Sequence, residues 1–356
     1  MRRHVMNNLN ELPGWLNRYS CPAFFVKKHI ITACNQSAEA LLLYPGMDIR
    51  ELLITGSEEY SGFQSGCLYL KLKLSSKSCG AAVTREADAD LFLLEQEPED
   101  ADLRSLSLAA RELRSPLSNL MIAADSLMKR SGEDPAIAEQ LARLNRSLHQ
   151  MHRLVNNMSD AGRSDLLTPA GIHDFSRLFH DIFEKLQAQL ETTGISLTYQ
   201  GLTESVWGVA NVGQLERAVL NIISNAMKFM PEGGRIHASL TRQKNMLQLS
   251  IQDSGSGIAE NVLGNVFTRY QRQPGIEDSR YGIGLGMVLI RSAAADHGGT
   301  VLIDRPEGKG TRVTMTMAIR QEAPVLRTPV IPPAAEDSRQ LLTELSDSLP
   351  WEFYQK

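Results

Sequence analysis

The chain has 356 residues, of which 42% are hydrophobic and 22% charged, so it has the composition of an ordinary folded protein and the length for two or three domains. Its 37 basic and 41 acidic side chains leave a net charge of −4, which predicts no nucleic-acid partner and no general attraction to an anionic membrane. The sequence has no apolar run of roughly 18 residues and no signal-peptide core in its first residues, so we expect a cytoplasmic protein without a membrane span.

Residues 1–98 alternate short β-rich runs with one helical stretch at 37–43, which predicts a small α+β domain. The four cysteines of the chain all fall in this block, without the C-x-x-C spacing of a zinc ribbon or the setting of a disulfide scaffold. A redox or metal-sensing role is one hypothesis for them, and burial as small core hydrophobes is the favoured one. They are Cys21, Cys34, Cys67 and Cys79.

Residues 99–165 contain an acidic connector followed by two heptad patterns. Apolar residues spaced alternately by three and four run from Leu103 to Leu127 and again from Ile137 to Met158, with a break at 131–135. This pattern predicts two helices in an αα-hairpin. Pairing with a second copy through residues 103–158 would bury both seams in a four-helix bundle, so we expect a homodimer, with an intramolecular coiled-coil spacer as the alternative.

Residues 166–322 mix amphipathic helices with strands, which predicts an α/β domain with helices over one mixed sheet. The remaining residues, 323–356, begin Pro-rich and end with a short amphipathic stretch at 337–346. We expect them to form a mostly flexible tail.

Five short motifs follow one another between residues 216 and 312: NIISNAMKF at 221–229, DSGSGI at 253–258, VFTRYQR at 266–272, GIGLGM at 282–287 and GKGT at 308–311. Each alone is a weak signal, but the ordered set is specific. It resembles the N, G1, F, G2 and G3 boxes of the histidine-kinase ATP-binding domain, which is related to the ATP sites of gyrase-type topoisomerases. The resemblance implies an α/β sandwich of that type, with ATP and Mg²⁺ as its ligands.

The chemistry of the first motif suits a metal-bound triphosphate. Asn225, one helical turn from Asn221, offers a carbonyl oxygen to Mg²⁺, and Lys228 offers a point charge to the phosphates. Singly, each residue has an ordinary structural explanation, as a polar helix-face residue or a solvated lysine. It is the ordered set that favours nucleotide binding.

The other boxes supply the remaining candidate residues. The resemblance assigns the exocyclic amine of adenine to Asp253, which stands before a glycine turn. Glycines before a helix let the backbone approach phosphate, and two arginines occupy the place from which the family positions phosphate or the facing helix. The polar segment 272–281 has the composition of a lid. The residues are Gly255, Gly257, Arg269, Arg272, Gly282, Gly284, Gly286, Gly308, Gly310 and Thr311.

The first heptad helix carries RELRSPLSNL at 111–120, which resembles the phosphoacceptor box H-E-L-R-[ST]-P-L of histidine kinases except that Arg111 stands in place of the histidine. A guanidinium has no lone pair with which to attack the γ-phosphorus. Glu112 is the family's general base, or else a carboxylate on a solvated helix face. His149 and His152 on the second helix lie outside the box, and we expect them to be partly exposed helix-face residues rather than acceptors.

The N-terminal block resembles a minimal PAS sensor domain, with a helix opened by NQSAEALL at 35–42. The sequence therefore predicts a sensor histidine-kinase family protein of two-component signalling: a PAS-like sensor, a dimerisation hairpin and an ATP-binding domain. Arg111 predicts a pseudokinase or regulatory member. One alternative is an active kinase that phosphorylates a histidine elsewhere or on a heterodimeric partner, and another is a non-enzymatic dimeric scaffold. A response regulator or a partner histidine kinase is the expected further partner.

Overall fold

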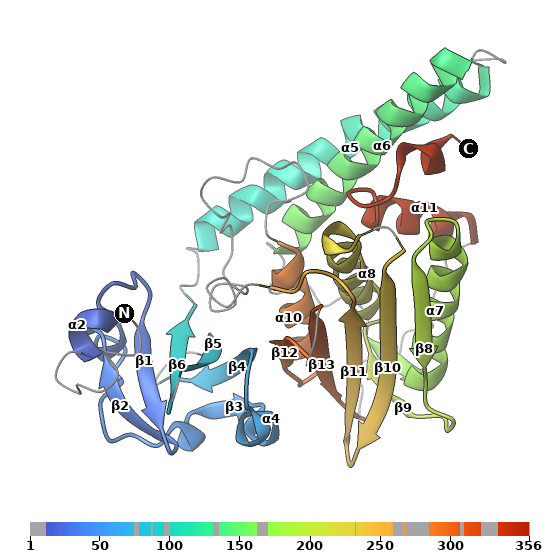
Figure 1. The fold of residues 1–356 in the computed structure, drawn as a ribbon. Coiled ribbons are helices and arrows are strands. Elements are labelled where there is room, and N and C mark those ends of the chain that lie inside the picture. The colour runs from blue at the N-terminus through green and yellow to red at the C-terminus, as the bar shows by residue number, and fades with distance from the viewer. Residues whose placement is uncertain are drawn as a thin grey trace. The chain divides into compact units, whose positions relative to one another are not determined.

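The structure, a computed structural model, describes residues 12–74, 78–86, 88–95, 100–130, 135–161, 170–231, 233–258, 267, 285–306, 310–321 and 334–355 (Figure 1). The chain divides into two compact units whose ranges interleave. The first comprises Met1–Glu97, Ala238–Thr268 and Ala294–Ala318, and the second comprises Pro98–His237, Arg269–Ala293 and Ile319–Lys356. Each unit is described by itself.

The N-terminal part of the first unit is an antiparallel sheet with short helices, as the alternating pattern predicts. The strand order is β2-β1-β6-β5-β4, and β3 pairs with β4 outside that row. Its core includes the stacked rings of Phe24 and Phe92, whose centroids are 4.9 Å apart. The elements are α2 (Leu12–Leu16), β1 (Ala23–Lys27), β2 (Ile30–Cys34), α3 (Gln36–Glu39), η1 (Ile49–Glu51), β3 (Leu53–Thr55), α4 (Ser57–Gly62), β4 (Cys67–Lys73), β5 (Ser78–Glu86) and β6 (Ala89–Leu94).

The predicted helix at 37–43 is shorter in the structure, because α3 ends at Glu39 and Leu42 has a φ of 62°. Asn35 fixes where α3 begins. Its buried side-chain oxygen accepts from the backbone N–H groups of Ala38 (2.9 Å) and Ala23 (3.0 Å), and its amide nitrogen donates to the Cys21 carbonyl at 2.9 Å. One side chain therefore caps the helix and ties it to β1.

Three of the four cysteines, Cys34, Cys67 and Cys79, are buried, and Cys21 is partly buried. Burial raises the pKa of the Cys34 thiol to about 11, which keeps it protonated at neutral pH. Within the described residues, no cluster of three or more His, Cys, Asp or Glu side chains has the arrangement of a metal site. These observations support burial of the cysteines as small core hydrophobes.

The later segments of the first unit supply four strands: β10 (Arg235–Gln243), β11 (Met246–Asp253), β12 (Val301–Asp304) and β13 (Arg312–Ala318). Their order is β12-β13-β11-β10, and β13 is antiparallel to both of its neighbours. β12 also pairs antiparallel with β4, with Leu302 opposite Leu68. All four strands lie within residues 166–322, the region in which the sequence predicts strands. The expected mixed α/β architecture with a large sheet is confirmed.

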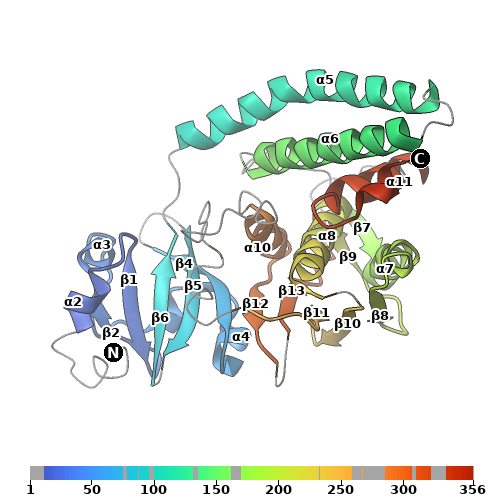
Figure 2. The same ribbon diagram turned by 45° about the horizontal axis from the view of Figure 1, so that its top comes forward.

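In the second unit, the helices α5 (Asp100–Arg130) and α6 (Pro135–Ala161) form the predicted hairpin and lie side by side in Figures 1 and 2. Pro116 lies inside α5, and the helix continues through it. The heptad stripe divides into two rows. One packs within the hairpin and comprises Ala110, Leu117, Ala124, Leu148 and Val155. The other is exposed and comprises Leu113, Leu120, Leu127, Ile137, Leu144 and Met151.

The rest of the second unit contains a two-stranded antiparallel sheet of β7 (Gly171–Asp174) and β9 (Trp207–Ala210), together with α7 (Phe175–Glu191), β8 (Ser196–Gln200), α8 (Val212–Phe229) and the first turns of α10 (Gly286–Asp296). Asp174 caps α7 by accepting from the Ser176 N–H at 3.0 Å, and the same oxygen accepts from the Val206 N–H at 3.1 Å. Within the described part of the chain, no helix has the length and apolar character needed to cross a bilayer.

Residues 334–355, called the C-terminal segment below, differ from the flexible tail that the sequence predicts. They form α11 (Ala334–Glu344), a turn and the 3-10 helix η2 (Trp351–Tyr354), drawn in red in Figure 1. Leu341, Leu345, Leu349 and Tyr354 are buried. The three leucines are spaced by four residues, so they form an apolar face that packs instead of remaining in solvent.

Candidate functional site

The candidate nucleotide-binding residues fall into two groups. Asn221, Asn225, Lys228 and Gly286 belong to the second unit, and Asp253, Gly255, Gly257, Gly310 and Thr311 belong to the first. Arg269, Arg272, Gly282, Gly284, Gly308 and the lid-like segment 272–281 lie outside the described residues.

Helix α8 carries the first group. It begins after Asn211, whose side chain accepts from the Gln214 N–H at 3.2 Å. Asn221 is buried on this helix. Its amide nitrogen donates to the Arg217 carbonyl at 2.8 Å, and its oxygen accepts from Arg153 Nη2 at 3.0 Å. A Cβ at Gly286, the first residue of α10, would stand 3.0 Å from that same oxygen, so a glycine lets α10 begin close to Asn221.

Asn225 and Lys228 differ in how they are held. Asn225 is partly buried, and its amide nitrogen lies 3.8 Å from Met287 Sδ. The Lys228 ammonium is 2.9 Å from Asp347 Oδ2 in the C-terminal segment, and its side chain is only 7% exposed. Burial lowers the pKa of Lys228, and the Asp347 carboxylate opposes that effect. The predicted phosphate cation is therefore paired with a carboxylate of this chain.

Asp253 organises the second group at the end of β11. Its Oδ1 accepts from the backbone N–H groups of Gly255 (2.7 Å) and Thr311 (3.1 Å). Burial raises the pKa of this carboxyl, and the two N–H bonds act in the opposite direction. Gly310 has a φ of 96°, and a Cβ there would meet the Asp253 carbonyl oxygen at 1.9 Å. The close approach of these two segments therefore requires glycine at position 310.

Gly257 follows the same turn. Its φ is 76°, and a Cβ would lie 2.9 Å from the Gly310 carbonyl oxygen. Glycine at 257 and at 310 thus lets two loops pass at backbone contact beside the partly buried carboxylate of Asp253. Such a close approach of two backbones is consistent with the ligand-binding turn that the glycine motifs predict.

Arg111 and Glu112 are both exposed on α5, at the position of the phosphoacceptor box. The second helix shows a different arrangement from the expected one. His149 is not a partly exposed helix-face residue: it is 4% exposed, with its Nδ1 2.7 Å from Thr343 Oγ1 and its ring 5.2 Å from that of Tyr354. The C-terminal segment covers it. Burial lowers its pKa to about 4, and neighbouring His152 adds to the effect.

His152 is only partly buried, and its Nδ1 lies 3.4 Å from the Asn156 amide nitrogen. Its pKa is lowered first by burial and then by the positive charges of Arg114, Arg217 and Arg339. Both imidazoles are therefore neutral at pH 7. His149 is nevertheless covered, so it is poorly placed to receive phosphate.

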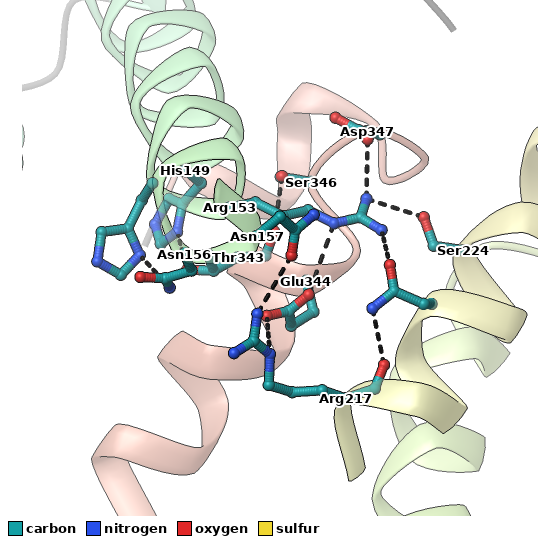
Figure 3. A network of polar contacts seen from close by, with 12 residues as sticks. His149, Arg153, Asn156, Asn157, Arg217, Ser224, Thr343, Glu344, Ser346 and Asp347 are labelled. Carbon is teal, nitrogen blue, oxygen red and sulfur yellow. Dashed lines mark hydrogen bonds and ion pairs between the residues drawn. The ribbon is translucent and has the colours of Figure 1, made fainter. Parts of the chain in front are cut away.

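Sequence reasoning missed a buried polar network that joins α6, α8 and the C-terminal segment (Figure 3). Its centre is Arg153, which reaches Asn221, Ser224, Glu344 and Asp347. The sequence offered one usable signal, an arginine placed between the seam residues Met151 and Val155. No pattern indicated that acidic residues near the C-terminus would meet it.

Comparison with known proteins identifies both regions. Residues 210–321 match the family described as histidine kinase-, DNA gyrase B- and HSP90-like ATPase, and residues 103–166 match the His Kinase A phospho-acceptor domain. The histidine protein kinase DivJ of Caulobacter vibrioides is 28% identical over 243 residues, which cover 64% of this chain and 39% of DivJ. The sensor histidine kinase WalK of Bacillus subtilis is 28% identical over 239 residues, covering 64% of this chain and 38% of WalK.

Among solved structures, full-length ShkA in complex with AMPPNP is similar with a TM-score of 0.50 and 21% identity, covering 68% of this chain and 54% of ShkA. One chain therefore joins a phospho-acceptor-type hairpin to an ATPase-type domain. The chain belongs to the sensor histidine kinase family of two-component systems. It spans less than half the length of DivJ and of WalK.

Proposed function

We propose that this chain is a dimeric regulatory member of the family, which binds ATP with Mg²⁺ and does not phosphorylate itself at the acceptor box. The observation that carries the proposal is Arg111, an exposed arginine in a box that otherwise matches from Glu112 to Leu117. In a phosphoacceptor, a neutral imidazole nitrogen forms a bond to the γ-phosphorus while the bond to ADP breaks. A guanidinium has no lone pair free to attack phosphorus and offers only hydrogen-bond donors.

The chemistry of the described side chains supports ATP as the ligand. The Asn225 carbonyl is a hard oxygen of the kind Mg²⁺ prefers, Lys228 supplies a cation, and Asp253 is a partly buried carboxylate able to accept from an amine. Bound Mg²⁺ would neutralise charge on the phosphates. The solved structure of ShkA contains AMPPNP, and we extend nucleotide binding from it to this chain.

The nucleotide assignment is tested by Asn225→Ala and Asp253→Ala, which remove the proposed metal ligand and the proposed base-reading carboxylate. We expect each to abolish or severely weaken binding of Mg·ATP in calorimetric titration, with an unchanged circular dichroism spectrum. Asn156→Ala is the matched control, since it removes an amide of α6 that lies outside the proposed ligand set. Wild-type affinity in both of the first two variants would contradict the assignment.

The acceptor assignment is tested by incubation with γ-labelled ATP. The unmodified chain should give no acid-labile, base-stable phosphate, and Arg111→His should produce a phosphohistidine because it restores the H-E-L-R-S-P-L string. Labelling of the unmodified chain at His152 would instead favour the active-kinase alternative. Labelling of an added partner kinase would favour phosphorylation across a heterodimer. An Arg111→His variant that binds ATP but stays unlabelled would favour the scaffold alternative.

The domain organisation is also part of the proposal. The exposed row on α5 and α6, in which Leu113 is 49% and Leu120 54% exposed, is the surface we assign to a second copy of the hairpin. The N-terminal sheet, with a helix capped by Asn35, supports a PAS-like sensor over residues 1–98. A response regulator is the proposed partner, as expected for a two-component protein.

A further inference from the structure

The C-terminal segment contacts two elements that the family assigns to different domains, the hairpin helix α6 and the helix α8 of the ATPase-type domain. All three belong to the second unit, and the segment lies beside both helices in Figures 1 and 2. On α6, Arg146 Nε and Gln150 Nε2 each donate to the Ser346 carbonyl at 3.2 Å. On α8, the Ser224 carbonyl accepts from Ser348 Oγ at 3.0 Å. The segment therefore bridges the two helices.

Glu344 holds the bridge electrostatically. Its side chain is 3% exposed and lies 3.5 Å from Arg153 of α6 and 3.5 Å from Arg217 of α8. The same two arginines repel each other where they are buried, and Glu344 counters both. Removal of this carboxylate would leave two guanidiniums facing one another in a site with little water. The helices are thus held in this arrangement by a charge that the C-terminal segment supplies (Figure 3).

Asp347 extends the same network to the nucleotide motif. Its Oδ2 lies 2.8 Å from Arg153 Nη1 and 2.9 Å from Lys228 Nζ. Arg153 also donates to Ser224 Oγ at 3.0 Å and to Asn221 Oδ1 at 3.0 Å. A carboxylate oxygen on an ammonium is the same kind of contact that a phosphate oxygen would make. In this structure Asp347 takes the position on Lys228 that the proposed function assigns to a nucleotide phosphate.

We propose that the C-terminal segment is an internal competitor of the nucleotide: docked between α6 and α8, it occupies Lys228 through Asp347 and holds α8 against α6 in an inhibited arrangement. The proposal rests on the proposed function, ATP binding by this domain. Nucleotide phosphate and Asp347 exclude one another on the Lys228 ammonium. The measured affinity for ATP is then the intrinsic affinity multiplied by the fraction of molecules whose segment is released.

The test compares the full-length protein with Asp347→Asn, which keeps the shape of the side chain and removes its charge. Glu352→Gln is the matched control, because it neutralises an exposed carboxylate of the same segment outside the network. We expect Asp347→Asn to bind Mg·ATP about 5- to 150-fold more tightly in calorimetric titration, the usual range of coupling between two sites, and Glu352→Gln to match the wild type. Equal affinity in all three proteins would overturn the competition.

Two measurements separate this proposal from ATP binding itself. Without nucleotide, the amides of residues 334–355 should be protected from hydrogen exchange in the wild type and less protected in Asp347→Asn. Addition of Mg·ATP should also reduce this protection in the wild type. In the pair Ser224→Cys with Ser348→Cys, whose native hydroxyl oxygens are 3.2 Å apart, oxidation should form a disulfide and prevent ATP binding, which reduction restores. Each single cysteine variant controls for the native thiols.

The outcomes are distinct. The segment could be protected and form the disulfide without nucleotide, and yet the oxidised protein could bind ATP as well as the reduced one. That result would overturn the inference and leave ATP binding intact. If no variant binds ATP, the proposed function and the competition both fail, whatever the segment does. An unprotected segment that forms no disulfide would overturn the docking.

Discussion

His149 gives the docking of the C-terminal segment a pH dependence. The imidazole is buried between α6 and the segment and faces Thr343 and Tyr354, with His152, Asp125 and Arg339 as its charged neighbours. The pKa of His149 in the folded protein is lowered to about 4 from an ordinary value of 6.5. Between these two pH values, His149 therefore binds a proton when the C-terminal segment is released and stays neutral when the segment is docked. This contribution to stability is complete above pH 6.5 and is lost as the pH falls toward 4.

The size of the effect follows from that difference in pKa. It corresponds to about 3 kcal/mol at full protonation, and about 2 kcal/mol of it is lost by pH 5. His149→Gln removes the titration and keeps an amide able to hydrogen bond with Thr343. The free energy needed to release the C-terminal segment should therefore depend on pH more strongly in the wild type than in His149→Gln. The difference between the two proteins, wild type minus variant, should fall by about 2 kcal/mol from pH 7 to pH 5.

Trp351 is a suitable probe, because it lies in η2 with its ring 5.4 Å from the Arg143 guanidinium. Urea titrations followed by its fluorescence, with Trp15 and Trp207 changed to phenylalanine, report on the segment. The comparison with His149→Gln cancels the titration of all other groups. A difference that changes by less than about 0.5 kcal/mol over this range would refute the argument, since it would mean that His149 is not desolvated by the segment.

Two further predictions concern other parts of the chain. Replacing Leu113 and Leu120 with glutamate should convert the proposed dimer into monomers in light scattering, because each puts an unpaired charge in a helical seam. A mass that stays dimeric would place association elsewhere. Gly310→Ala should destabilise the protein by about 1–3 kcal/mol more than Gly46→Ala in thermal unfolding, the usual cost of overpacking. Both glycines have positive φ, but only the added methyl at 310 meets backbone, and equal losses would contradict the close approach.

The parts of the fold that sequence predicts well are those governed by periodicity. The hairpin helices and the strands β10 to β13 lie at their predicted positions, because a heptad or a period of two reports directly on which face is buried. Periodicity also identified the seam residues, but not their division into two rows. Ala110 and Leu117 face α6 whereas Leu113 and Leu120 do not, and that requires knowing how the two helices are rotated against each other.

The parts that sequence misses depend on contacts between distant segments. His149 is an ordinary helix-face residue on α6 alone, and it is buried only because Thr343 and Tyr354 are brought over it from about 200 positions along the chain. The Pro-rich composition of 323–333 favours a flexible tail, and the amphipathic stretch at 337–346 does not show what its leucines pack against. The motif residues are predicted from the ordered set of motifs and its resemblance to the family, yet nothing in a motif shows whether Lys228 is free or already paired.

The two regulatory features act on different steps, so combining their variants tests them together. Arg111→His supplies an acceptor nitrogen, and Asp347→Asn removes the carboxylate from Lys228. If the C-terminal segment acts only by competing with nucleotide, the double variant should label much faster than Arg111→His at low ATP, and the two should reach the same rate at saturating ATP because mass action displaces the segment. A difference that persists at saturation would contradict simple competition. Asp347 would then also act after nucleotide has bound, through its contact with Arg153 between α6 and α8.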